Sequence, residues 1–89
     1  MAAVTGVAWV YLLRCADGSL YCGWTIDLER RVAAHNGGGA SRYTRSRLPV
    51  ELAWARELPD RAAARREEAR IKRLPRAAKL ALVEGGEAP

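Results

Sequence analysis

Two short apolar runs near the start of the chain predict a β-hairpin. Residues 7–15, VAWVYLLRC, and residues 19–24, SLYCGW, are too short and too rich in β-branched and aromatic side chains to favour a helix. The ADG between them, at 16–18, is typical of a tight turn in which Gly18 accepts a positive φ. Gly23 weakens the second strand unless another group must approach the backbone closely at that position.

A helix and a loop are expected next. The stretch TIDLERRVAAHN, residues 25–36, has Thr25 as its expected N-cap and ends at Asn36, which is followed by glycines. Residues 37–49, GGGASRYTRSRLP, are expected to form a loop that carries three arginines, one tyrosine and no acidic residue.

The second half of the chain predicts a strand and two helices. Residues 50–57, VELAWARE, alternate enough for a third strand. This alternation is expected to place three apolar side chains on one face: Val50, Leu52 and Trp54. Helices are expected over residues 61–74 and, after Pro75, over residues 76–84, where glycines end the pattern.

The resulting order is strand, strand, helix, strand, helix, helix. It predicts a small three-stranded antiparallel sheet flanked by helices, which is an α+β fold. A chain of 89 residues has room for one hydrophobic core. We therefore expect a single domain over residues 1–84 and a disordered tail over residues 85–89.

The length of the hairpin loop decides where the two tyrosines point. With a two-residue loop, Tyr21 would pair with Arg14 and face away from Tyr11. With a three-residue loop, Tyr21 pairs with Leu13 and both phenols lie on one face of the sheet. The three-residue loop requires a left-handed glycine, so we expect a positive φ at Gly18.

The charge of the chain predicts a polyanionic partner. The net charge is +5, the pI is about 9.9, and 13 of the 15 basic residues are arginine. Arginine binds phosphate in a forked geometry, although a high arginine content can also reflect genome composition. No apolar run is long enough to span a membrane, and the first residues lack the charge of a signal peptide. We expect a cytoplasmic protein with reduced cysteines, Cys15 and Cys22.

Helical spacing places polar groups at the border of expected core stripes. Arg31 and His35 share a stripe with apolar residues of the first helix, and Glu68 lies beside apolar residues of the second, with Glu67 one step round. Each has an ordinary structural explanation as well. A strand tyrosine can fill the core, Arg31 and His35 can lie on a solvated edge, and Glu68 can pair with a cation one turn away.

The order of these blocks resembles the GIY-YIG nuclease superfamily, in particular its small stand-alone bacterial single-domain (YhbQ-like) group. Trp9-Val10-Tyr11 precedes Tyr21-Cys22-Gly23 by about ten residues. T-x-D-L-x-x-R, a histidine, GGASRYTRSRLPVEL and ARREEARIKRLPRAAKLALV then follow in order. The resemblance covers residues 7–83, which is nearly the whole chain.

The resemblance implies a phosphodiester-cleaving site with one divalent metal ion. It implies six catalytic positions: Tyr11, Tyr21, Gly23, Arg31, His35 and Glu68. One phenol would be the general base for the attacking water, and Arg31 would stabilise charge on the phosphate. Glu68 would hold Mg²⁺ or Mn²⁺, with Glu67 as the alternative ligand. A phenol is a weak base at neutral pH, so the mechanism needs its pKa to be depressed.

The chain departs from the family pattern at two places. Trp24 stands where many members carry a lysine, and no asparagine occurs after Asn36. Trp24 is expected to fill the core, and the alternative is stacking on a base or sugar.

We expect a metal-dependent endonuclease that acts on DNA, directed by structure or by ends, with a role in DNA repair or recombination. Four residues of the basic loop are expected to contact phosphates: Arg42, Tyr43, Arg45 and Arg47. Partner proteins would supply targeting, and an edge strand could support a homodimer. The alternative is a non-catalytic nucleic-acid-binding module that keeps the nuclease fold.

Overall fold

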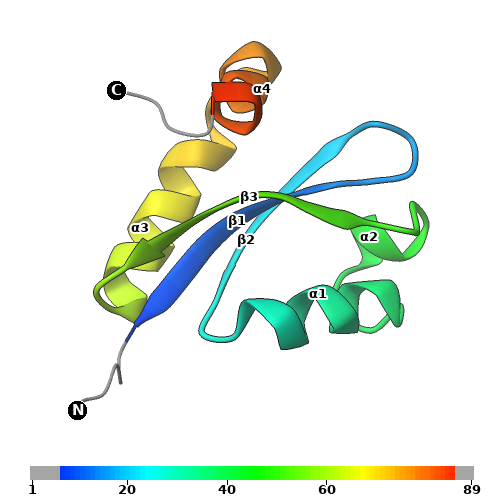
Figure 1. The fold of residues 1–89 in the computed structure, drawn as a ribbon, viewed down its shortest axis with the longest axis horizontal. Helices are drawn as coiled ribbons and strands as arrows, with labels where there is room; N and C mark the ends of the chain where they lie inside the picture. The colour runs from blue at the N-terminus through cyan, green and yellow to red at the C-terminus, as the bar shows by residue number, and fades with distance from the viewer. Residues whose placement is uncertain (1–6, 86–89) are drawn as a thin grey trace.

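A computed structural model describes residues 7–85 of the chain, and the residues expected to form the tail beyond Gly85 lie outside this range. Strands β1 (Ala8–Arg14), β2 (Leu20–Thr25) and β3 (Glu51–Leu58) form one antiparallel sheet in the order β2-β1-β3 (Figure 1). Helices complete the α+β fold, so the predicted fold class is confirmed.

The hairpin adopts the three-residue loop. The Cys15 amide donates to the Ser19 carbonyl at 2.9 Å, and Gly18 has a φ of 86°. Tyr21 therefore lies opposite Leu13, and Tyr11 lies opposite Gly23. Both tyrosines point to the same face of the sheet, as the loop geometry predicts.

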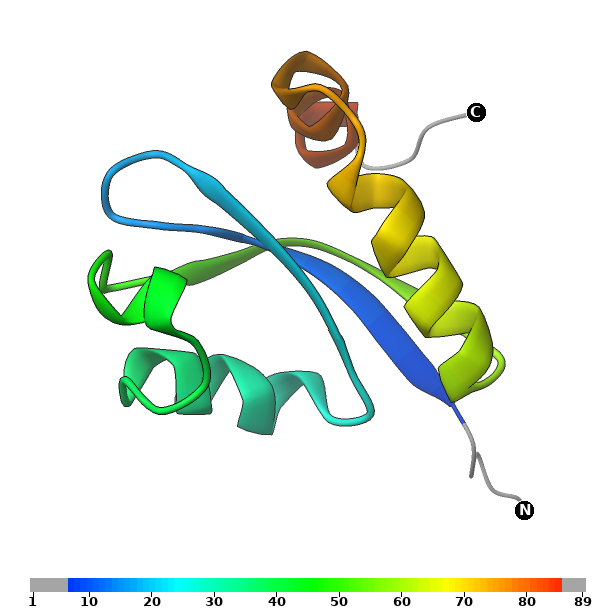
Figure 2. The same cartoon turned by 180° about the vertical axis from the view of Figure 1, so that it is seen from behind.

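Helices cover the two faces of the sheet differently. The helices α1 (Leu28–Asn36) and α2 (Arg42–Arg45) lie on one side, and α3 (Arg61–Lys72) and α4 (Arg76–Gly85) lie on the other (Figures 1 and 2). Each side has its own apolar cluster. The α3 side contains Val10, Leu12, Cys22, Trp54, Ile71 and Leu82, and the α1 side contains Tyr11, Leu13, Cys15 and Val50.

The expected alternation along β3 is wrong at one position. Leu12 pairs with Trp54 but the next residue of β1 pairs with Leu52, so the strand contains an irregularity at Ala53. An extra residue in one strand reverses the alternation beyond it. Trp54 therefore faces α3, whereas Val50 faces α1, and Leu52 is 44% exposed.

Helix α1 begins later than the sequence predicts. Its N-cap is Asp27, whose side chain accepts from the Arg30 amide at 3.1 Å. Thr25 is instead the last residue of β2, and its hydroxyl accepts from the Asp27 amide at 3.2 Å. An aspartate and a threonine are both good N-caps, and the pairing of β2 with β1 decides between them.

The expected loop between α1 and β3 contains the short helix α2. The side chain of Ser41 caps it by accepting from the Tyr43 amide at 3.1 Å. At the other end of this segment, the Asn36 amide donates to the Val50 carbonyl at 2.9 Å and accepts from the Val50 backbone amide at 2.8 Å. The segment is therefore anchored on both sides, which places α2 next to α1.

The two later helices follow the predicted order with small changes at their ends. Asp60 caps α3 by accepting from the Ala63 amide at 2.8 Å, and α3 ends two residues before the expected position. Helix α4 includes Gly85, which the sequence assigns to the tail. Among residues 7–85, no helix is long and apolar enough to cross a membrane.

Candidate active site

The phenol of Tyr11 lies directly over Gly23. A Cβ atom at Gly23 would stand 2.5 Å from the Tyr11 hydroxyl and 2.7 Å from its ring carbon Cζ. These distances are shorter than any van der Waals contact, so a larger residue would displace the ring. The close approach explains why a strand that prefers bulky residues contains a glycine here.

A chain of hydrogen bonds runs from this phenol into the protein. Tyr11 Oη lies 3.0 Å from His35 Nε2, and His35 Nδ1 lies 2.8 Å from Thr44 Oγ1. The Thr44 hydroxyl donates to the Ser41 carbonyl at 3.3 Å. Because that carbonyl can only accept, Thr44 accepts from Nδ1–H, and His35 Nε2 accepts from the Tyr11 hydroxyl. The network therefore assigns the histidine tautomer.

Burial keeps both members of the Tyr11–His35 pair neutral. Burial raises the pKa of Tyr11 well above that of a free phenol, Tyr21 raises it further, and Arg31 opposes the change. Burial also lowers the pKa of His35, and the charge of Arg31 lowers it in the same direction. The pKa of the Tyr11 phenol is therefore raised, whereas the mechanism needs it to be lowered. Tyr11 can lose its proton only if a neighbouring group accepts it.

Tyr21 belongs to a row of rings that links the site to α2. Its ring meets that of His35 at 5.1 Å in an edge arrangement and that of Tyr43 at 5.8 Å. The guanidinium of Arg47 lies over the ring of Tyr43, 3.8 Å from its centroid. Arg47 also pairs with Asp17 in the hairpin loop at 3.1 Å. This row fixes the position of α2 against the hairpin.

Arg31 is half-buried on α1 and faces the end of β2. It lines a hollow of about 230 Å³ together with Trp24, Ile26 and Arg61. No hydrogen bond or ion pair joins its guanidinium to any residue between 7 and 85, and its charge acts on the pKa of both Tyr11 and His35. A positive charge so placed is suited to an anion at the phenol.

The two glutamates of α3 face different strands. Glu67 pairs with Arg56 of β3 at 2.8 Å and with Arg70 at 2.6 Å, and its hydrogen bond to Arg70 is the main cause of its lowered pKa. Glu68 faces β2, where its backbone carbonyl accepts from the Cys22 thiol at 3.9 Å. Burial, and next the charge of Glu68, raise the pKa of Cys22 to about 12.

Glu68 is the acid on the tyrosine side of this pair. Its charge also raises the pKa of Tyr11, and its side chain is 21% exposed. In the absence of a ligand it pairs with Lys72 at 3.3 Å, which is the ordinary structural role that its helical spacing allows. Glu67 is held by two arginines and is the poorer candidate for a ligand.

The donor set of the site suits one kind of metal ion. Within residues 7–85, no group of three or more histidines, cysteines and acids could hold a metal ion. Mg²⁺ is commonly bound through one or two carboxylates, with waters and substrate phosphates as its remaining ligands. The oxygen atoms of Glu68 fit such a partial shell, whereas they do not fit a zinc site.

The residues of the expected basic loop separate into two groups. Arg42 and Arg45 are exposed on α2, whereas Arg47 is occupied by Asp17 and by the Tyr43 carbonyl. Tyr43 is 38% exposed and packs against Tyr21. Of the four, Arg42 and Arg45 are therefore the ones with side chains available to a ligand.

Trp24 does not fill the core as expected. Its side chain is half-buried, belongs to neither apolar cluster, and lines the hollow beside Arg31 and Arg61. Trp24 shares a face of β2 with Cys22, but it lies near the end of this edge strand, where Arg31 and Arg61 border the same hollow.

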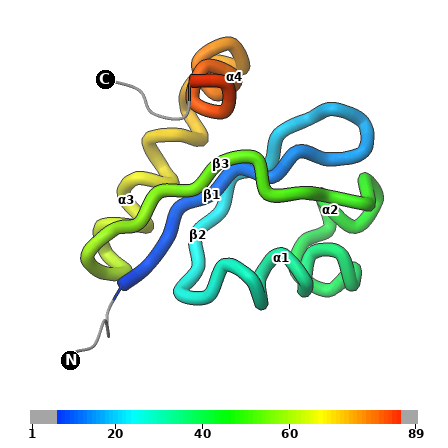
Figure 3. Tube along the Cα trace, in the orientation of Figure 1, coloured from blue at the N-terminus to red at the C-terminus, as the bar shows by residue number. Residues whose placement is uncertain are grey.

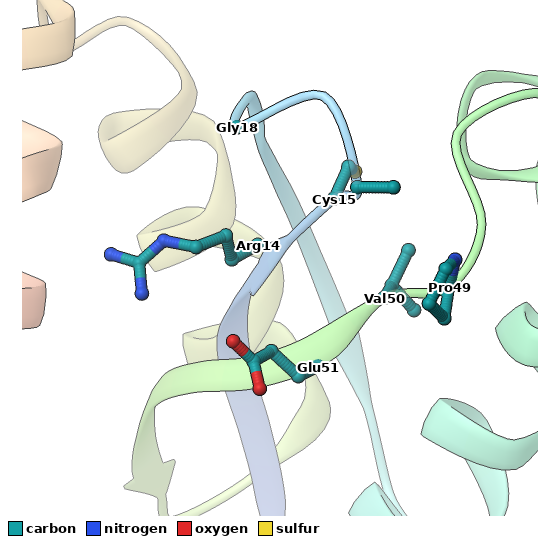
Figure 4. A pocket seen from close by; sticks show the side chains of 7 residues that line it. Arg14, Cys15, Gly18, Pro49, Val50 and Glu51 are labelled. Carbon is teal, nitrogen blue, oxygen red and sulfur yellow. The ribbon is translucent and has the colours of Figure 1, made fainter.

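A hollow of about 500 Å³ at the far end of the hairpin is lined by none of the expected site residues (Figure 4). Cys15, Gly18 and Val50 line it, with the charged side chains of Arg14 and Glu51 at its edge. The lining of this hollow is partly polar and partly apolar, and it contains no cluster of metal-binding side chains.

Two residues that contact the candidate site were not predicted from the sequence. Thr44 is fully buried and completes the hydrogen-bond chain, but it stands between arginines in a segment that reads as a loop. Arg61 lies 30 positions after Arg31 in the sequence, yet both line one hollow. Spacing along the chain contains no signal for either contact, since both depend on how separate elements pack.

The three-stranded antiparallel sheet with its flanking helices is the fold of a known class of catalytic domain. Residues 7–81 match the family model described as the GIY-YIG catalytic domain, and the chain belongs to this family. The family is one of nucleases, which indicates a nucleic-acid substrate.

Within the family, the chain is similar to proteins named UPF0213. It is 51% identical over 84 residues to a UPF0213 protein of Nitratidesulfovibrio vulgaris, covering 92% of this chain and 76% of that one. It is 52% identical over 75 residues to one of Xanthomonas axonopodis pv. citri, covering 84% and 74%. The solution NMR structure of a UPF0213 protein from Bacillus halodurans aligns with a TM-score of 0.59 at 38% identity, over 93% of this chain and 88% of that one.

Proposed function

We propose that the protein is a divalent-metal-dependent nuclease that hydrolyses phosphodiester bonds in DNA. The observation that carries the proposal is the hydrogen-bonded chain Tyr11–His35–Thr44, which begins above Gly23, where the charges of Arg31 and Glu68 both act on the pKa of Tyr11. Phosphodiester hydrolysis needs an oriented water, a proton acceptor and positive charge for the developing anion. In this proposal Tyr11 orients the water, Tyr11 and His35 accept its proton, and Arg31 provides the positive charge.

Tyr11 and His35 act together as the base in this proposal. As the water oxygen bonds to phosphorus, its proton moves to Tyr11 Oη while the phenol proton moves to His35 Nε2. The bond from phosphorus to the leaving oxygen breaks, and that oxygen takes a proton from solvent. Tyrosinate never accumulates, which agrees with the raised pKa of Tyr11.

Arg31 has two effects in the proposed step. In the free protein, the burial of His35 opposes its protonation, and the charge of Arg31 adds to this effect. A bound phosphate would offset that charge, so the histidine would become a better proton acceptor when the substrate is in place. The same guanidinium would stabilise negative charge on the phosphoryl oxygens.

Glu68 would hold Mg²⁺ or Mn²⁺, which supplies Lewis-acid polarisation of the phosphoryl oxygen when bound. Tyr21 would hold the ring of His35 in place through their edge contact. The exposed Arg42 and Arg45 would contact phosphates without reading sequence. We further propose that DNA structure or DNA ends direct cleavage and that the protein acts in repair or recombination. We also propose a cytoplasmic location, targeting by partner proteins, and homodimerisation through an edge strand.

The test is cleavage of single-stranded, nicked and branched DNA in Mg²⁺. Tyr11→Phe removes the phenol hydroxyl, and we expect its rate to fall by about 10²–10⁴-fold, the usual contribution of general base catalysis. Glu68→Gln is expected to lose cleavage as well. Glu67→Gln is the matched control, because it alters the neighbouring acid on the same helix and should keep the activity.

Cleavage that survives in both Tyr11→Phe and Glu68→Gln would contradict this site. The second candidate function is a nucleic-acid-binding module without catalysis, and the net charge of +5 favours it equally. Wild-type protein that binds DNA in a salt-sensitive way but cleaves none of the substrates would support this second function.

A further inference from the structure

We propose that one face of α3, made of Arg61, Arg65 and Lys72, binds the sugar–phosphate backbone of the nucleic acid next to the reacting phosphate. We call it the α3 basic face. The proposal rests on the nuclease function above in taking nucleic acid as the ligand, and it adds a surface that lies outside the expected basic segment at 42–47.

Helical spacing places these cations around the proposed metal ligand. Arg61, Arg65, Glu68 and Lys72 are separated by four, three and four residues, so they share one side of the helix. Lys72 confirms this arrangement through its ion pair with Glu68 at 3.3 Å. Cations thus stand on the turns before and after the carboxylate.

The basic face continues directly into the site. Arg61 lines the hollow of about 230 Å³ that also includes Trp24 and Arg31, and Arg65 lines a second hollow with Glu68. Helix α3 packs against both β1 and β2. In Figures 2 and 3, α1 and α3 lie on opposite sides of the β1–β2 pair. The hollow beside Trp24 is bordered by Arg31 of α1 and Arg61 of α3, so a ligand at this edge of β2 would meet both helices.

The two arginines have no structural role in the described part of the protein. The guanidinium groups of Arg61 and Arg65 make no hydrogen bond or ion pair with a residue between 7 and 85, and both residues are exposed. By contrast, Arg70 is held by Glu67 and Arg47 by Asp17. The unpaired guanidinium groups are free to bind phosphate in a forked geometry.

The position of Arg61 is unfavourable for the helix alone. It is the first residue of α3, and the first turn contains no acidic residue. The amino end of a helix carries partial positive charge, so a cation there lowers helix stability, whereas a bound anion raises it. The Asp60 carboxylate already caps this helix end, so a phosphate here would bind through the guanidinium of Arg61.

The surface indicates the path of the bound strand. Tyr21, near the start of β2, contacts Tyr43 of α2, while Trp24, near the end of β2, lies beside Arg61 of α3. The phenol of Tyr11 lies over Gly23, between these two ends. A strand that follows β2 would therefore contact α2 on one side of the reacting phosphate and the α3 basic face on the other, with the ring of Trp24 against a sugar or base.

Two double variants with the same loss of charge test the proposal. Arg61→Ala/Arg65→Ala removes the two unpaired arginines of the basic face. Arg73→Ala/Arg76→Ala removes two exposed arginines beyond the end of α3 that line neither of the two hollows. Binding of a short fluorescein-labelled DNA, single-stranded and duplex, is measured by anisotropy in EDTA over a range of salt. Thermal melts by circular dichroism check that all proteins are folded.

We expect Arg61→Ala/Arg65→Ala to weaken binding at least about 10-fold at moderate salt. The slope of log K against log salt is negative, and its magnitude should decrease by about 1.4–1.8, the value for two lost phosphate contacts. Arg73→Ala/Arg76→Ala should change the slope little. Equal effects of the two double variants would mean that net charge alone matters and would overturn the proposal, as would wild-type protein that binds no DNA.

The same measurements separate this surface from catalysis. A wild-type protein that cleaves no DNA but loses binding only in Arg61→Ala/Arg65→Ala would support the surface and contradict the nuclease. A protein that cleaves DNA while this variant binds as tightly as Arg73→Ala/Arg76→Ala would support the nuclease and contradict the surface.

Discussion

The two faces of the central sheet are built from the same strands but from different chemistry. On the α3 side, Leu12 and Ile71 are fully buried in an apolar cluster. On the α1 side, the buried residues include the polar groups of Tyr11, His35 and Thr44. Each of these polar groups has a hydrogen-bond partner, and among residues 7–85 no buried side-chain nitrogen or oxygen atom lacks one.

The difference agrees with the proposal that the α3 face stabilises the fold and that the α1 face carries the catalytic groups. Burying a polar group is unfavourable unless its hydrogen bonds are made, so a polar network adds little to stability compared with an apolar core of the same volume. The α1 side nevertheless holds a neutral phenol and a neutral imidazole in contact. Such a pair is poised to move a proton, and the apolar side holds the sheet that positions it.

The largest expected effect breaks the apolar side. Ile71→Ala removes a fully buried side chain of the α3 cluster. We expect the free energy of unfolding to fall by about 2–5 kcal/mol, because apolar contacts are lost and a cavity remains. Urea denaturation measures the change, and Ile71→Val, with an expected loss of about 0.5–1.5 kcal/mol, is the graded control. A loss for alanine no larger than that for valine would contradict the assignment of this face as the main core.

A smaller effect is expected on the polar side from Thr44→Val, which keeps the shape but removes the acceptor of His35 Nδ1. The unfolding free energy should fall by about 1–3 kcal/mol, the cost of one unpaired buried donor. The cleavage rate should fall more than stability explains, and its acid limb should move to lower pH, because the imidazolium loses a stabilising hydrogen bond.

Thr44→Ser restores the hydroxyl and serves as the rescue variant for this prediction. Its pH profile should return to that of the wild type. A serine variant that behaves like the valine variant would show that Thr44 contributes packing and not hydrogen bonding.

The smallest expected effect is the pH dependence of stability from His35, the single histidine of the chain. Its pKa is lowered by burial in the folded protein, so the unfolded chain binds the proton first as pH falls. Stability should therefore be full above the unfolded pKa of about 6.5 and decline below it, by at most about 1.4 kcal/mol per pH unit for one proton.

Urea denaturation between pH 7.5 and pH 5 measures this decline. The carboxylates with lowered pKa, those of Asp17 and Glu67, titrate at lower pH and leave this window to the histidine. His35→Gln is the control and should flatten the profile. A wild-type profile that is already flat would mean that His35 is not held neutral by burial.

Much of this fold is predictable from neighbours in the sequence. The ADG turn selects a three-residue loop with a left-handed Gly18, and that loop alone places Tyr11 and Tyr21 on one face. The glycine of β2 signals a close approach, although it does not identify the approaching group. Helical spacing separates Glu68 from Glu67 by orientation, and their partners then show which strand each one faces.

Packing between separate elements decides the remaining features. The irregularity in β3 moves Trp54 to the α3 side, the contact of α2 with α1 brings Thr44 to His35, and the approach of α3 to β2 places Arg61 beside Trp24. The sequence by itself determines which side chains can act as base, cation and ligand, because these depend on residue type and local backbone geometry. Only the tertiary structure determines which of them meet, because burial and distance depend on contacts between residues far apart in the chain.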